Sequence, residues 1–247
     1  AGKDIPWLLF LAGVWDMTVK LSRRLAAVAR HVPPGSVVAD IGADHALLPL
    51  YLVGGGIVSR AVAVEAGCGP YDAAVAAVRR SGLGKSIEVR LGDGLQVLAP
   101  GEVGVAVLAG MGGETICRIL AAGRSVLEQM DRLIVQPMRD VPLVRRWLAD
   151  NGWRLREEEV VQEEGHYYIV MAAIPGKEKI DDILLELGPR LLEKRDPVLF
   201  NFLQHRRNQI AAVLKDLGKS RDKRTDIKGE RLKKEAEKIR EVLDNWP

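Results

Sequence analysis

The chain is poor in the features that mark several classes of protein. It has 247 residues but only two cysteines, Cys68 and Cys117. Neither belongs to a C-x-x-C pair or to a Cys/His spacing that suggests a structural metal site. We therefore expect no metal, and small buried or half-buried thiols in a reducing cytoplasm. The net charge is only +3, which does not by itself indicate a nucleic-acid-binding protein.

Long hydrophobic runs are also missing. The segment Trp7–Ala12 is apolar, but it is much shorter than the roughly 20 residues that span a bilayer, so we expect no membrane association. Only Lys3 precedes it as a basic residue, and no small-x-small cleavage site follows, so it resembles a signal peptide weakly. We interpret residues 1–16 as a leader or an added extension, and Met17 as the natural start.

A complete dinucleotide fingerprint is absent as well. The apolar run Val37–Ile41 predicts a buried strand that leads through a tight turn into a helix. Of the pattern G-x-G-x-x-G, this turn contains only Gly42, and Asp44 and His45 take the place of the later glycines. In doubly wound folds, nucleotide-like ligands bind at the carboxyl ends of the strands. Asp44 and His45 in place of glycines disfavour a pyrophosphate-binding turn. They favour an S-adenosylmethionine (SAM) site with a polar group near the reacting atoms.

Strand-like and helix-like segments alternate through residues 17–175, which we take as one domain. This alternation predicts an α/β, Rossmann-like fold with a mostly parallel sheet and helices on both faces. The last two strands are expected to pair in antiparallel fashion at the sheet edge. Strands are predicted at 37–41, 61–65, 87–91, 103–108, 133–136, 153–161 and 166–173, and helices at 21–31, 47–53, 70–80, 114–122, 125–130 and 141–151.

Residues 176–247 differ in pattern from the part before them. Pro175-Gly176 is the expected boundary, and apolar residues then recur at helical spacing. We predict an appendage of two or three helices, of the kind that forms an antiparallel coiled-coil hairpin. From Lys177 onward there are 18 basic and 14 acidic residues, so this part is slightly basic.

The unusual residues gather in four loops that follow predicted strands and should meet at one edge of the sheet. Glu65 ends the second strand, where a carboxylate can accept hydrogen bonds from both ribose hydroxyls; the alternative is a cap on the next helix. Asp93, or the backbone N–H of Gly94 beside it, is suited to the amino group of an adenine. The alternative for Asp93 is a turn-forming aspartate.

The other two loops carry the remaining candidates. Gly110 and Gly112, on either side of Met111, allow the backbone to approach a ligand closely or form a tight turn. Asp40 is expected to organise its loop or to lie near the positive end of the ligand, and it needs donors if buried. For Asp44 the alternatives to catalysis are helix N-capping and loop organisation. His45 is interpreted as a supporting residue of the cofactor loop, with a catalytic imidazole as the alternative.

Together these motifs resemble the bacterial tRNA (adenine-22-N1)-methyltransferases. The resemblance covers roughly Leu21–Ile174. It is carried by Asp-Ile-Gly-x-Asp-His at 40–45, Gly-Asp-Gly-Leu at 92–95, Ala-Gly-Met-Gly-Gly at 109–113 and Gln-Pro at 136–137. It implies a class I SAM-dependent methyltransferase that acts on the D-loop region of tRNA. SAM would lie against Gly42, Glu65, Asp93 and the Gly110 loop, with Asp44 at the catalytic face.

The resemblance also implies a place for the substrate. Gln136 and Pro137 would line it, together with Met138, where the family commonly has asparagine; the segment 65–70 is less polar than in the family. Tyr51, Tyr71 or Met138 would flank the target base. The slightly basic tail is a candidate platform for the tRNA backbone; its alternative is a solvated mixed-charge surface. The candidate cations are Arg190, Lys194, Arg195, Arg206 and Arg207.

Three other functions fit parts of the pattern. A methyltransferase with a small-molecule or protein substrate would use the same loops. A non-catalytic tRNA- or protein-binding module could share the fold, although the intact acidic residues argue against it. A dehydrogenase is the least favoured, because the glycine fingerprint is missing. We expect a cytoplasmic enzyme and favour a monomer.

Overall fold

The structure is a computed structural model that describes residues 19–195, 197–217 and 223–246. The expected leader at residues 1–16 and the expected start at Met17 lie outside the described residues.

A seven-stranded sheet organises the chain, with the strand order β3-β2-β1-β4-β5-β7-β6. Strands β1 to β5 are parallel, whereas β7 runs antiparallel to both β5 and β6. The mostly parallel sheet with an antiparallel pair at its edge is thus confirmed. The strand order reverses between β1 and β4, where doubly wound sheets bind ligands. The strands are β1 Val37–Ile41, β2 Arg60–Glu65, β3 Ile87–Leu91, β4 Val105–Gly112, β5 Arg132–Arg139, β6 Trp153–Glu163 and β7 His166–Pro175.

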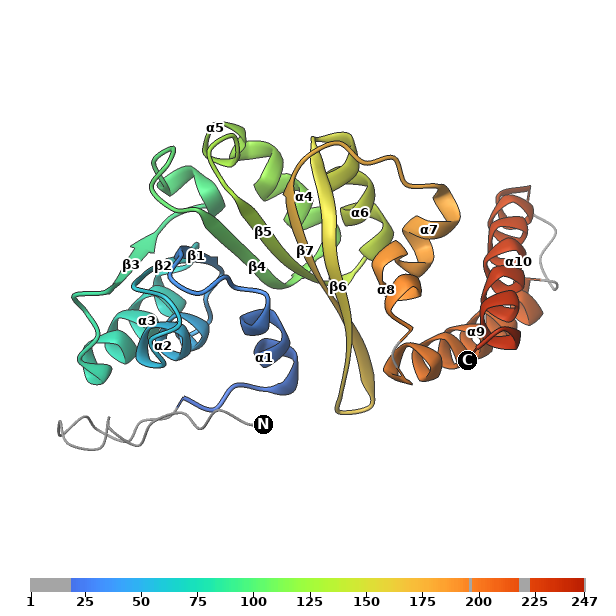
Figure 1. The fold of residues 1–247 in the computed structure, drawn as a ribbon, viewed down its shortest axis with the longest axis horizontal. Coiled ribbons are helices and arrows are strands. Elements are labelled where there is room, and N and C mark those ends of the chain that lie inside the picture. The colour runs from blue at the N-terminus through green and yellow to red at the C-terminus, as the bar shows by residue number, and fades with distance from the viewer. Residues whose placement is uncertain (1–18, 196, 218–222, 247) are drawn as a thin grey trace, which may run out of the picture.

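Helices cover both faces of this sheet (Figure 1). One face buries Val38 and Val107 with α1 and α2, and α3 packs beside them on Ala63. The other face buries Ala39 and Leu108 with α4, α5 and α6. The strands are buried on both sides, which explains why they are almost wholly apolar in sequence. The helices are α1 Arg23–Arg30, α2 Leu47–Gly54, α3 Cys68–Ser81, η2 Gly94–Val97 (a 3₁₀ turn), α4 Gly113–Ala122, α5 Arg124–Leu127 and α6 Val141–Asp150.

Two central strands are longer than the sequence predicts. β4 continues to Gly112 and β5 to Arg139, with irregular pairing that places Met111 opposite Pro137. Glycine and proline are poor strand formers, so the sequence pattern ended these strands at 108 and 136. The extension attaches the glycine loop after residue 109 to the end of β5.

Four helices, rather than two or three, follow β7 in the described part of the chain. α9 and α10 pack against each other in antiparallel fashion, because Phe200 lies near Trp246 (5.4 Å between ring centroids) and Arg206 pairs with Glu235. This is the helical hairpin that the spacing predicts. The four helices are α7 Asp182–Leu187, α8 Pro189–Lys194, α9 Pro197–Leu217 and α10 Lys223–Asp244.

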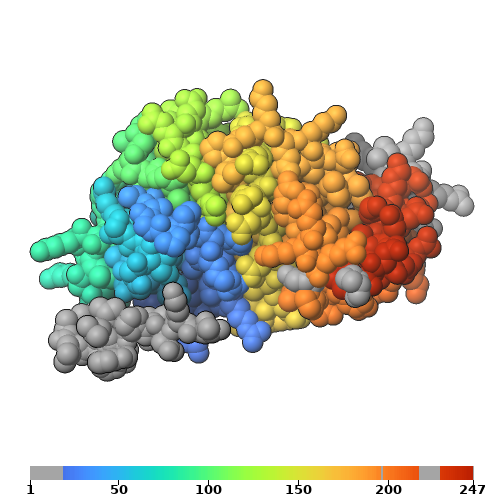
Figure 2. Space-filling view, viewed as in Figure 1, coloured from blue at the N-terminus to red at the C-terminus, as the bar shows by residue number. Residues whose placement is uncertain are grey.

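The tail shares its hydrophobic core with the sheet. Leu187, Leu191 and Leu203 belong to the same buried cluster as the residues under α4 and α6. The side chain of Arg145 on α6 is fully buried; its Nε donates to Glu158 Oε1 at 2.7 Å, and its Nη1 donates to backbone carbonyls of α7. Figure 2 shows the surface of the tail abutting that of β6. The expected boundary therefore coincides with the end of β7 but does not separate two cores.

The cysteines are only partly as expected. Cys117 is half-buried, and burial raises the pKa of its thiol to about 11, whereas Cys68 is exposed at the start of α3. Within the described residues, no group of three or more histidine, cysteine, aspartate or glutamate side chains is placed to hold a metal ion. No helix in the described part of the chain is long and apolar enough to cross a membrane.

Candidate cofactor and active site

The loop after β1 has an unusual backbone. Gly42 has φ +73°, and Asp44, His45 and Ala46 follow with φ of 39°, 62° and 56°. Residues with side chains rarely adopt this left-handed conformation, so three in succession are a strained arrangement typical of functional sites. The loop exposes the side chains of Asp44 and His45, whose Oδ1 and Nε2 lie 3.7 Å apart. Ala46 is the N-cap of α2 and no side chain caps it, so Asp44 is not the helix cap considered above.

Two buried carboxyl groups lie beside this loop. Asp40 and Glu65 are 5 % and 6 % exposed. Burial, with the negative charges of Glu65 and Asp44, raises the pKa of Asp40 to about 7. Burial also raises the pKa of Glu65, although its carboxylate accepts a hydrogen bond from the backbone of Asp44. Among the described residues, Glu65 Oε1 has no hydrogen-bond partner. A buried acceptor of this kind is costly unless a ligand satisfies it.

The alternative role for Glu65 is not observed. The N-cap of α3 is Gly67, and no side chain caps it. Asp93, by contrast, is the N-cap residue of the turn η2, but its side chain forms no cap hydrogen bond. Its Oδ2 instead lies 3.2 Å from Nη1 of Arg118, in an ion pair that is about half exposed on both sides. Such a pair holds its members weakly, so the Asp93 carboxylate remains available to a ligand.

The loop after β1 meets the glycine-rich end of β4 at the switch point of the sheet. A Cβ on Gly42 would lie 2.5 Å from Cε of Met111, so the glycine gives room for that side chain. Gly110 has φ +79°. A Cβ on Gly94 would lie 2.7 Å from Ile119, so packing against α4 also requires that glycine. The glycines thus serve tight packing and positive φ, whereas contact of their backbone with a ligand stays a prediction.

The end of β5 corrects two of the substrate-contact predictions. The side chain of Gln136 is 0 % exposed, and Pro137 is also buried. Gln136 Oε1 accepts hydrogen bonds from Gly110 N–H (3.1 Å) and Arg24 Nη1 (2.6 Å). Its Nε2 donates to the carbonyl of Pro137 at 3.0 Å. Gln136 and Pro137 therefore support the site from below. Of the three, Met138 alone is exposed, at 49 %, and its contact with substrate stays a prediction.

Two of the five tail cations form ion pairs within the protein. Arg190 forms ion pairs with Glu178 and Glu193, and its Nε donates to the carbonyl of Leu155 at 3.0 Å. Arg206 pairs with the buried carboxylate of Glu235 on α10. Composition cannot distinguish such arginines from free ones. These two hold the tail together and to β6, contrary to their predicted contact with RNA.

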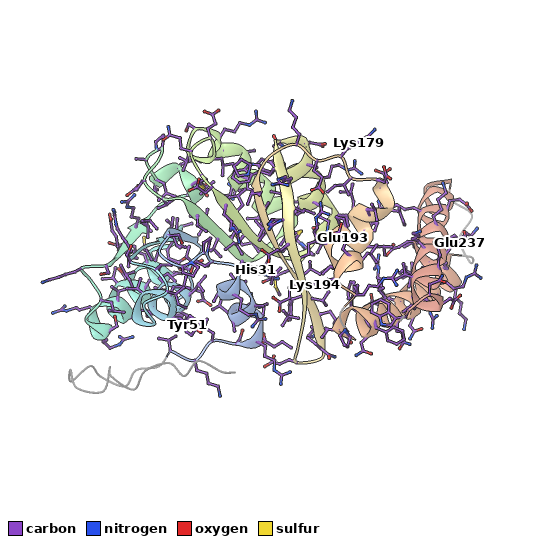
Figure 3. All side chains as sticks on the ribbon, in the orientation of Figure 1. His31, Tyr51, Lys179, Glu193, Lys194 and Glu237 are labelled. Atoms are coloured by element: carbon purple, nitrogen blue, oxygen red, sulfur yellow. The ribbon has the colours of Figure 1, made fainter. Side chains whose placement is uncertain are left out.

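The other three tail cations are exposed. They are Lys194, Arg195 and Arg207. Arg195 Nη1 donates to the carbonyl of Asn245 at 3.1 Å. The other N–H groups of its side chain form no hydrogen bond with the described residues. Figure 3 labels Lys194 near α8, far from Tyr51 on α2. α8 and α9, which carry Lys194 and Arg207, lie on the other side of β6 from α2 (Figure 1).

Three functional candidates were missed in the sequence. Arg24 on α1 reaches Gln136, Tyr168 on β7 lies under its guanidinium (5.6 Å from Cζ to the ring centroid), and Arg139 ends β5 with its side chain 76 % exposed. An arginine on an amphipathic helix has the same pattern as any solvated charge, so no local signal distinguishes Arg24. Arg139 directly follows the Gln-Pro-Met segment, a neighbourhood that did point to the site.

Comparison with known proteins agrees with this geometry. A family model described as "Methyltransferase domain" matches residues 21–171. The chain is 36% identical to the tRNA (adenine(22)-N(1))-methyltransferase of Bacillus subtilis (strain 168) over 92% of this chain and 98% of that protein. Among solved structures, the B. subtilis m1A22 tRNA methyltransferase is 34% identical, with a TM-score of 0.83 over 91% of this chain and 99% of that one.

A further solved structure carries the cofactor. A Streptococcus pneumoniae protein in complex with S-adenosyl-L-methionine is 33% identical to this chain, with a TM-score of 0.81 over 91% of this chain and 100% of that one. The coverage extends beyond the sheet into the tail helices. This chain therefore belongs to the tRNA (adenine(22)-N1)-methyltransferase family, the family that its sequence motifs resemble.

Proposed function

We propose that this protein transfers the methyl group of SAM to N1 of the adenosine at position 22 of tRNA. The observation that carries the proposal is the contact between the loop after β1 and the glycine-rich end of β4. There an exposed Asp44 lies beside the buried carboxyl groups of Asp40 and Glu65. The similar proteins of B. subtilis are named as methyltransferases of this position in tRNA, which supports the proposal.

The residues present fit SAM. The unpaired Oε1 of Glu65 suits the ribose hydroxyls, and Asp93 or the N–H of Gly94 suits the adenine amine. Asp40 lies where a carboxylate would face the positively charged end of the cofactor. The backbone of Gly42, Met111 and Gly112 would line it, with His45 at the mouth of the loop. SAM, when bound, supplies a methyl group activated by a positively charged sulfur.

Asp44 is the proposed catalytic residue. N1 of adenine carries a free lone pair, so no base is needed to create the nucleophile. Methylation leaves a positive charge on the purine ring. A carboxylate close to N1 or to the 6-amino group stabilises this charge as it develops and can later accept a proton. The strained loop presents the Asp44 side chain, 87 % exposed, for that purpose.

The target base must leave its own structure to react. N1 lies on the Watson–Crick edge, so the adenosine has to be unpaired or pulled out of its tertiary contacts. Met138 offers an exposed apolar side chain at the end of β5 against which the base can lie. Gln136 and Pro137 fix the position of that side chain from below.

The tail is proposed to bind the tRNA backbone through Lys194, Arg195 and Arg207. We treat 17–175 as the methyltransferase unit and 176–247 as a tRNA-binding unit built onto its core. A monomer that acts on tRNA in the cytoplasm is the simplest assembly. Replacing Lys194 and Arg207 with alanine should weaken tRNA binding and leave SAM binding unchanged; unchanged tRNA affinity would contradict the platform.

The cofactor site can be tested by calorimetric titration with SAM. The wild-type protein should bind SAM, and Glu65→Gln should weaken binding by about tenfold, because an amide replaces the charged acceptor of the ribose hydroxyls. Labelled methyl from SAM should then appear in tRNA incubated with the wild-type protein. Binding without transfer to any tRNA would contradict the proposed substrate.

A further inference from the structure

Charge is divided along the edge of the sheet that carries the site. Carboxylates lie at or just beyond the carboxyl ends of β1, β2 and β3; they are Asp40, Asp44, Glu65 and Asp93. On the side of β4 and β5, two guanidinium groups approach the edge, from Arg24 and Arg139. The carboxylate half suits a cationic cofactor, whereas the guanidinium half suits a polyanion. The target base has to react where the two halves meet.

The two arginines bracket the segment Gly110–Gly112. A Cβ on Gly110 would lie 3.4 Å from Nη1 of Arg24, and a Cβ on Gly112 would lie 3.1 Å from Nε of Arg139. The missing side chains therefore leave room for both guanidinium groups against the backbone. Met138, directly before Arg139 in the chain, exposes its apolar side chain beside this segment.

Arg24 is held firmly in this position. Its Nη1 donates to Gln136, its guanidinium lies over the ring of Tyr168, and its backbone N–H donates to Glu163 Oε1 at 3.3 Å. The other end of α1 is fixed at His31 (labelled in Figure 3), whose backbone carbonyl accepts a hydrogen bond from Arg132 Nη1 at 3.0 Å. No partner is given among the described residues for Nε and Nη2 of Arg24, so these donors remain for a ligand.

Arg139 is freer than Arg24. Its Nε lies 3.6 Å from Asp140 Oδ2, a separation too long for a hydrogen bond, and its side chain is 76 % exposed. Glu114, which follows the segment Gly110–Gly112, lies exposed in the first turn of α4, where the helix dipole accommodates its charge. Planar guanidinium groups with free donors are well suited to phosphate oxygens.

We propose that Arg24 and Arg139 form an arginine pair that binds the tRNA phosphates on either side of the target nucleotide and so holds its base against Met138. The pair is separate from the tail cations on the other side of β6. This inference rests on the proposed function, because the polyanion is the tRNA that is methylated. Arg24 has a second task, since it also positions Gln136 and thereby the Gly110 loop.

The test measures tRNA affinity as a function of salt concentration, with SAM affinity and methyl transfer alongside. Arg139→Ala should weaken tRNA binding by about tenfold and reduce the slope of log affinity against log salt by about 0.7, the value for one contact to a single strand. SAM affinity should not change. Arg24→Ala should do the same and also lower kcat, whereas Arg24→Lys should restore the salt slope.

Arg80→Ala is the matched control. Arg80 is an exposed arginine in the last turn of α3, which leads back to the opposite edge of the sheet, so the same loss of charge should change nothing. Wild-type salt slopes in Arg24→Ala and Arg139→Ala would overturn the proposal. So would a loss of SAM affinity with tRNA affinity unchanged, which would assign the guanidinium groups to the SAM carboxylate. If the wild-type protein itself neither binds nor methylates tRNA, the proposed function fails instead.

Discussion

Gln136 Oε1 lies 2.6 Å from Nη1 of Arg24 and also accepts the backbone N–H of Gly110. This oxygen on β5 therefore holds both α1 and the glycine-rich end of β4 through hydrogen bonds. Gln136 is predicted from the sequence to contact substrate, but its side chain instead holds the Gly110 backbone and the Arg24 guanidinium in place. Because the Gln136 side chain is fully buried, its amide finds its hydrogen-bond partners within the protein.

Gln136→Leu should lower both stability and turnover. The substitution removes the acceptor of two partly buried donors, Arg24 Nη1 and the N–H of Gly110, which destabilises the folded state by about 1 kcal/mol. Denaturant unfolding and steady-state kinetics would measure the two effects. Gln162→Leu, at an exposed position on β6, is the control and should change neither. Normal stability in Gln136→Leu would show that these hydrogen bonds are unimportant.

Asp44→Asn should lower kcat by about 10²-fold or more, because the developing charge on the purine loses its carboxylate. SAM affinity should change much less, since the Asp44 side chain is exposed at the mouth of the loop. Single-turnover methyl transfer and SAM titration would separate the two quantities. Asp150→Asn, an exposed carboxylate at the end of α6, should behave like wild type. An equal loss of SAM affinity and turnover would instead assign Asp44 a structural role.

Asp40 should make the free energy of unfolding fall as the pH rises. Its pKa is about 7 in the folded protein, against 3.8 as the ordinary value. The folded state therefore holds this proton more tightly than the unfolded state does. The stability that it contributes is complete below about pH 4 and is lost as the pH rises to about 7.

The comparison is between wild type and Asp40→Asn, measured by denaturant unfolding from pH 4 to pH 8. Wild type should lose stability relative to the variant across this range. Glu102, whose pKa a hydrogen bond from Arg90 holds at about 2, has the opposite effect in both proteins and cancels in the difference. A flat difference would mean that Asp40 is ionised throughout.

Breaking the buried ion pair should loosen the tail. Arg145→Met removes the partner of Glu158 and the donor to the carbonyl groups of α7, which should cost about 3–5 kcal/mol of unfolding free energy. The double variant Arg145→Met, Glu158→Leu should recover much of this loss, because no buried charge is then unpaired. Hydrogen exchange in α7 and α8 would report whether the tail detaches. A double variant as unstable as the single one would show that the carbonyl contacts dominate.

The order of strands and helices could be predicted because the strands are continuous apolar runs. The loop residues Asp44, Glu65 and Asp93 could be singled out because polar residues at strand ends share one edge of a parallel sheet. Interactions between distant segments could not be predicted. Neither the contact of Arg24 with Gln136 nor the burial of Arg145 leaves a local pattern. The same limit explains why Arg190 and Arg206 were assigned to RNA, although their partners lie elsewhere in the fold.

The most direct test compares two tRNA transcripts that differ only at position 22. One carries adenosine there and the other guanosine, and both are incubated with the protein and methyl-labelled SAM. The labelled nucleoside is then identified after digestion, and its position is mapped by the reverse-transcription stop at N1-methyladenosine. The account predicts labelled 1-methyladenosine at position 22 of the first transcript and none in the second. Label at another position or in another nucleoside, or equal label in both transcripts, would contradict it.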